Sequence, residues 1–178
     1  MTTAKSRLSI KQQTIYTVAA IFAAVALPQI FHVMGAVSGL GTSLGETMLP
    51  MHLPILLVGF LAGPYAGAIS GLAAPLVSFA FSGMPTAALL PFMMLELCAY
   101  GFICGMMRNA NIPAFVKVVI AQIFGRIVRA IALCFATYIL GFNAIPVSII
   151  WTSIAAGIFG IVLQWALIPL ILHRVESK

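Results

Sequence analysis

Acidic residues are nearly absent from this sequence of 178 residues. Asp and Glu together number three, all of them glutamates: Glu46, Glu96 and Glu176. Catalysis by paired carboxylates and metal binding by clustered carboxylates therefore lack the residues they need. The chain also has no Gly-Lys-Ser or Gly-Lys-Thr phosphate loop for ATP hydrolysis. We expect no catalytic residue, no metal and no cofactor.

Cysteine is scarce as well. Cys98, Cys104 and Cys134 all lie within apolar stretches, and their spacing fits neither a zinc site nor a secreted disulfide framework. We interpret all three as packing residues.

Charged residues make up only 7% of the chain, against 62% hydrophobic residues. That leaves too little polar surface to cover a soluble domain, so the solvent must be lipid. Runs such as 15–30 are apolar on every face, whereas the strands of a membrane β-barrel alternate polar and apolar residues. The sequence therefore predicts an all-α integral membrane protein.

The hydrophobic segments determine the number of membrane crossings. A transmembrane helix needs about 20 mostly apolar residues. Clusters of Gly, Pro and Asn separate six such segments, at about 12–34, 48–63, 65–82, 86–107, 113–141 and 147–173. The second is short and carries Pro50 and Pro54, so we expect it to be irregular on its outer side. Residues 1–178 are predicted to form one domain, a compact bundle of six transmembrane helices.

The basic residues indicate the orientation of this bundle. They gather at the two chain ends and in the connection between the fourth and fifth segments: Lys5, Arg7, Lys11, Arg108, Lys117, Arg174 and Lys178. The positive-inside rule then predicts a multi-pass protein of the cell membrane with both termini in the cytoplasm. The formal net charge of +6 is thus a topology signal, and we expect no nucleic-acid partner.

Small residues recur at a spacing of four and predict close approach of helices. Gly59, Gly63, Gly67 and Gly71 form one such series, which we interpret as internal packing. The first outward connection, 35–50, is also rich in glycine and is expected to be a flexible cover.

Three ionisable residues lie deep inside the predicted helices: Glu96, Arg126 and Arg129. Such residues are costly in a bilayer unless they are paired or functional. We expect Glu96 and Arg126 to form an ion pair between the fourth and fifth helices. No second carboxylate remains for Arg129, so a group of a ligand is its expected partner.

Other polar and soft side chains are candidates for the same site. Tyr100 shares a helical face with Glu96, while Asn143 and Trp151 offer an amide and an aromatic wall. His52 and Met84 flank outward loops, although packing and interfacial roles are equally ordinary for these residue types. Gln164 is as well explained by a hydrogen bond to a neighbouring helix.

Several short motifs in the first half of the chain carry a resemblance to a known family. The sequence resembles the substrate-binding S components of energy-coupling factor vitamin transporters in these stretches: Pro50-Met51-His52-Leu53-Pro54, Gly59-Phe60, Gly63-Pro64, Ser78-Phe79, Gly83-Met84-Pro85, Glu96-Leu97 and Tyr100-Gly101. The resemblance implies a six-helix bundle in the lipid bilayer that captures a vitamin from outside. It also implies docking on a membrane coupling subunit that two ATPase subunits drive. The signature is most similar to cobalamin-type S components, with pantothenate-type second.

The same resemblance implies a docking surface on the first helix, where several members carry an Ala-x-x-x-Ala pattern. Two overlapping pairs match it here, Ala19 with Ala23 and Ala20 with Ala24. Either pair fits the pattern.

Two other classes of function compete with capture. An autonomous facilitator or channel for small solutes would need no partner, but we find no inverted repeat. A membrane enzyme would need catalytic residues that the sequence does not supply.

Overall fold

The computed structural model describes residues 8–41 and 43–176. Lys5, Arg7 and Lys178, which contributed to the predicted topology, lie outside these residues, as does the side chain of Glu176.

The described residues form helices only, which confirms the all-α prediction. Their bounds are α1 (Ile10–Val37), α2 (Ser43–Met48), α3 (His52–Ala62), α4 (Pro64–Ser82), α5 (Leu90–Met106), α6 (Ala114–Tyr138), α7 (Ile149–Ala156) and α8 (Ile158–Glu176). Five segments are long and apolar enough to cross a membrane, and one of them combines α2 with α3. The helix α5 is also apolar but shorter, and these elements together are those of a helical membrane bundle.

Two of the predicted segments are interrupted. The second is irregular on its outer side, as predicted: α2 ends at Met48, α3 begins at His52, and Leu49 between them takes a positive φ of 47°. The sixth is divided at Gly157, whose N–H caps α7 by donating to the Ser153 carbonyl. The first outward connection is also not simply a flexible loop, since it contains α2.

The distribution of polar side chains is the reverse of that in a soluble protein. The buried polar residues are His52, Ser70, Ser78, Glu96, Gln122 and Gln164. Large apolar side chains such as Phe22, Ile131 and Phe159 are exposed instead. This pattern is the one expected when lipid surrounds the helices and polar groups are satisfied inside the bundle.

Glycines bring α4 and α5 into backbone contact. A Cβ atom at Gly67 would collide with the backbone of Gly101, and one at Gly71 with the backbone of Leu97. A Cβ atom at Gly59 on α3 would likewise collide with the carbonyl oxygen of Gly101. The glycine series therefore serves internal packing, as predicted, and holds the α3–α5 core together.

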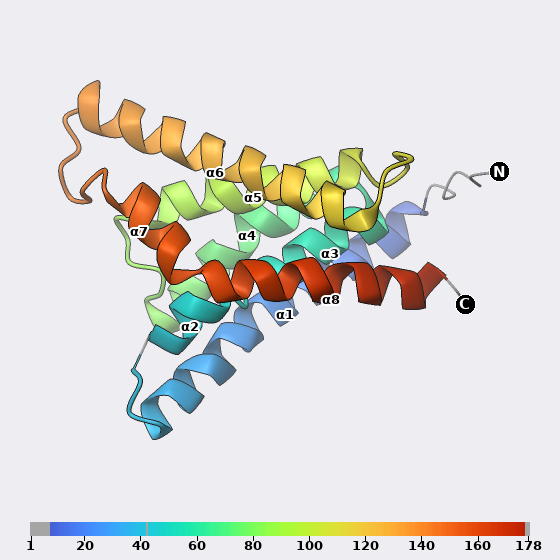
Figure 1. Ribbon diagram of the computed structural model, residues 1–178, viewed down its shortest axis with the longest axis horizontal. Helices are drawn as coiled ribbons and strands as arrows, with labels where there is room; N and C mark the ends of the chain where they lie inside the picture. The colour runs from blue at the N-terminus through green and yellow to red at the C-terminus, as the bar shows by residue number, and fades with distance from the viewer. Residues whose placement is uncertain (1–7, 42, 177–178) are drawn as a thin grey trace.

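Figure 1 shows how this core positions the outer helices. The start of α1 and the end of α8 lie at the same end of the bundle. At the opposite end α1 and α6 diverge, and the short helices α2 and α7 lie between them. This divergent end is where the chain encloses a cavity.

Candidate functional site

A cavity of about 420 Å³ lies at the end of the bundle away from the chain termini. Its wall is formed by helices α1 to α7 together with the 49–51 and 84–86 connections. The residues that line it include Pro28, His32, Glu46, Leu49, Met51, His52, Ser78, Met84, Thr86, Met93, Glu96, Arg126, Arg129, Thr152 and Ser153. Its volume lies within the range of small-molecule sites.

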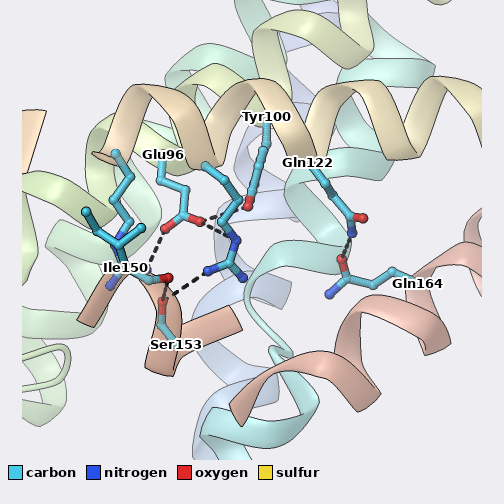
Figure 2. A network of polar contacts seen from close by, with 8 residues as sticks. Glu96, Tyr100, Gln122, Ile150, Ser153 and Gln164 are labelled. Carbon is cyan, nitrogen blue, oxygen red and sulfur yellow. Dashed lines mark hydrogen bonds and ion pairs between the residues drawn. The ribbon is translucent and has the colours of Figure 1, made fainter. Parts of the chain in front are cut away.

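A single buried carboxylate organises the inner wall of the cavity. Glu96 on α5 is fully buried, and its Oε1 accepts a hydrogen bond of 2.8 Å from the Tyr100 hydroxyl. Figure 2 shows both side chains and the dashed contacts that link Glu96 to Tyr100 and to side chains of α6. Since α5 carries Glu96 and Tyr100 four residues apart, both project from one face of the helix.

Two arginines from α6 share this carboxylate. Arg126 Nε lies 3.1 Å from Glu96 Oε1, and Arg129 Nη1 lies 3.0 Å from Glu96 Oε2. The predicted pair of Glu96 with Arg126 is therefore present. The prediction that Arg129 has no protein partner is wrong, because the two oxygens of one carboxylate can accept from two guanidinium groups on successive turns of α6.

The two arginines are not held equally. Arg126 also donates through Nη1 to Ser153 Oγ at 3.3 Å, and that hydroxyl donates in turn to the Ile150 carbonyl on α7. Arg129 has its one bond to Glu96, and its buried Nε finds no hydrogen-bond partner among the described residues. Arg126 thus braces α5, α6 and α7, while Arg129 retains an unused donor.

A second polar network lies deeper in the bundle. Gln122 Nε2 donates to Gln164 Oε1 at 2.8 Å, and Gln164 Nε2 donates to the Leu49 carbonyl at 3.3 Å. Trp165 Nε1 donates to Gln122 Oε1 at 2.6 Å. Gln164 therefore bonds to the neighbouring helix α6 (Figure 2), as its alternative interpretation predicted. Its bond to the Leu49 carbonyl also holds the turn that follows α2.

The predicted site residues fall into three groups. Arg129, Glu96, His52 and Met84 line the cavity. Tyr100 does not line it but lies behind Glu96, 99% buried, with its ring 5.5 Å from that of His52. Trp151 is 74% exposed and Asn143 is also exposed, and neither lines the cavity.

The misplacement of Trp151 has a plain geometric cause. On α7 it is the next two residues, Thr152 and Ser153, that border the cavity, while Trp151 is largely exposed. The sequence offered one signal for this, an adjacent pair of hydroxyl residues within an otherwise apolar segment. Glu46 was also missed as a lining residue.

The two alanine pairs of α1 differ in their surroundings. Ala20 packs with Val58 and Ala62 of α3, and Ala24 is completely buried in the main core. Ala19 is exposed and Ala23 half-buried. Ala20 and Ala24 therefore serve internal packing, which leaves Ala19 and Ala23 as the pair that can meet a partner.

We predict strong energetic coupling between Glu96 and Arg126. Glu96→Gln leaves two largely buried arginines without their carboxylate, which costs about 3–5 kcal/mol of folding free energy. Arg126→Gln should cost less, because Arg129 still pairs with Glu96. A double-mutant cycle of unfolding in mixed micelles should give a coupling of about 0.5–3 kcal/mol.

The matched control combines Glu96→Gln with Lys11→Gln, an exposed position at the start of α1. That cycle should be additive. Additivity in the Glu96 and Arg126 cycle itself would contradict the proposed brace between α5 and α6.

Comparison with known protein families bears on the whole bundle. The family model described as ECF transporter, substrate-specific component, matches residues 14–172, which include the cavity and nearly all of the helical bundle. Comparisons with curated proteins and with solved structures gave no match. The family is one of transport subunits rather than enzymes, and the match spans most of the chain. The chain therefore belongs to the family of substrate-specific components of ECF transporters.

Proposed function

We propose that the chain captures a vitamin from outside the cell in the cavity between α2, α5, α6 and α7 and delivers it to an ECF module. The observation that carries this function is the cavity itself, whose inner wall holds buried charged side chains inside an apolar bundle. Charged groups at such depth are usually retained for a substrate or a transport step.

The expected orientation agrees with this role. Arg108 and Lys117 lie near the end of the bundle where α1 begins and α8 ends, opposite the cavity. The positive-inside rule assigns that end to the cytoplasm, so the cavity opens toward the outside. A coupling subunit and two ATPase subunits would then act from the cytoplasmic side.

The size of the cavity bears on which vitamin binds. The sequence signature favours cobalamin first and pantothenate second. A volume of about 420 Å³ suits a drug-sized ligand, and a corrinoid is several times larger than that. The cavity therefore favours pantothenate or another small vitamin over cobalamin.

Helix α2 is the element best suited to cover the bound vitamin. Its last residue, Met48, packs against Gly160 of α8, and the following residue, Leu49, packs against Gly157 just before α8; a Cβ atom at either glycine would collide with them. Glu46 and Leu49 also line the cavity. Movement of α2 away from these glycines would open the cavity without disturbing the α3–α5 core.

The exposed face of α1 is the proposed docking surface for the coupling subunit. Ala19 and Ala23 lie four residues apart beside Phe22, which is 75% exposed. Small residues at this spacing allow a partner helix to approach closely.

Equilibrium binding to the purified chain in detergent tests the capture function. The panel contains cobalamin, pantothenate, folate, riboflavin, thiamine and biotin. We expect nanomolar affinity for one small member, because the cavity is already formed in the structure and need not be assembled when the vitamin binds. If no member bound to protein with a cooperative unfolding transition, vitamin capture would be contradicted.

The double variant Ala19→Leu/Ala23→Leu tests the docking surface. We expect it to bind the vitamin normally but to lose uptake in cells that express the ECF module, since bulky side chains separate the two helices. Ala36→Leu, at an exposed position near the outer end of α1, is the matched control and should preserve uptake. Equal loss of binding and uptake, or unchanged uptake, would refute this docking surface.

A further inference from the structure

The charges on the inner wall of the cavity do not balance. Glu96 contributes one negative charge, and Arg126 and Arg129 contribute two positive charges. The sequence has only two other acidic residues, and Glu176 lies in the last turn of α8, far from the cavity. Glu46 borders the cavity from α2, and its exposed side chain lies outside the buried cluster of Glu96, Arg126 and Arg129. The buried cluster therefore has an excess of one positive charge.

An excess positive charge inside a membrane bundle calls for an anion. A charged side chain near the bilayer centre costs about 2.5–3.5 kcal/mol even on scales measured by insertion. Glu96 already accepts from both arginines and from Tyr100, so its two oxygens are largely committed. No further carboxylate reaches the arginines among the described residues.

Two unused polar atoms mark where the anion would bind. Arg129 Nε is buried without a hydrogen-bond partner in the described structure, and so is Nδ1 of His52. His52 is 95% buried, and both side chains line the cavity. A guanidinium presents its donors as a planar fork that matches the two oxygens of a carboxylate.

We propose that the captured substrate carries one carboxylate, which binds Arg129 beside His52 and neutralises the arginine–glutamate cluster. This substrate class presupposes the capture function proposed above. Arg129 contacts the substrate, whereas Arg126, held by Glu96 and Ser153, acts as a positioning residue. Since the excess is a single charge, a monoanionic compound fits the cluster and a cationic one does not.

Matched pairs of probes test the carboxylate directly. Binding of pantothenate, biotin and nicotinate is compared with that of panthenol, biotin amide and nicotinamide, which lack the charge. For the pair that binds best, we expect the carboxylate to bind about 10- to 100-fold more tightly, the range for hydrogen bonds to charged groups. Thiamine, riboflavin and cobalamin complete the set.

Substitution of Arg129 tests whether this residue recognises the carboxylate of the substrate. In Arg129→Gln, the affinity for the carboxylate probe should fall to that for the neutral probe, while the affinity for the neutral probe is preserved. Arg129→Lys should restore part of the preference for the carboxylate. Trp151→Phe, at an exposed position outside the cavity, is the matched control and should leave the preference unchanged. If Arg129→Gln does not fold, the proposal is decided by whether the wild-type chain binds the carboxylate probe more tightly than its neutral counterpart.

The outcomes separate the two levels of inference. Equal binding of a carboxylate and its neutral counterpart, or an unchanged preference in Arg129→Gln, overturns the carboxylate while capture stands. The carboxylate is likewise overturned, and capture stands, if thiamine, riboflavin or cobalamin binds most tightly. Absence of all binding to folded protein overturns capture itself, and the carboxylate with it.

Discussion

Glu96 is the group on which the polar interior of this protein depends. Its carboxylate is buried within an apolar bundle, where it accepts from Tyr100 on its own helix and from two arginines on α6. Through Arg126 and Ser153 the same charge also holds α7 in place. The chain thus concentrates its buried charge in one cluster, and that cluster forms the inner wall of the cavity. The ion pairs and hydrogen bonds of Glu96 therefore contribute both to the stability of the fold and to the candidate binding site.

The glycine contacts and the charge cluster divide the bundle into two parts. Helices α3, α4 and α5 meet through backbone contacts at Gly59, Gly67 and Gly101, which leave no space for rearrangement. Helices α2 and α7 are short and border the cavity, and α2 is joined to α8 through the Leu49 carbonyl and two glycines. A rigid core with a separable cover suits a subunit that must admit and release a ligand.

Composition and charge placement predicted much of this architecture, because a protein in a lipid bilayer must be apolar outside and must pair its polar groups inside. Helical crossings, the Glu96–Arg126 pair and the glycine packing all follow from the cost of unpaired polar groups in lipid. The irregular outer side of the second segment followed from its prolines, but the division of the sixth segment did not, since it depends on the turn at Gly157. Nor did the second bond of Glu96 to Arg129, because sequence spacing does not reveal how two carboxylate oxygens are shared. Trp151 lies outside the cavity because tertiary contacts set the rotation of the short helix α7, and Asn143 lies in the connection between α6 and α7.

Transport by the chain alone, compared with transport by the chain plus its ECF module, tests the central claim most directly. The measurement uses proteoliposomes and the radiolabelled vitamin that binds most tightly. If the chain is a capture subunit, liposomes that contain it alone will retain no more ligand than there are binding sites. Accumulation will then require the coupling subunit and ATP. Equilibration of the vitamin across the bilayer by the chain alone, over many turnovers, would contradict this account and favour an autonomous facilitator.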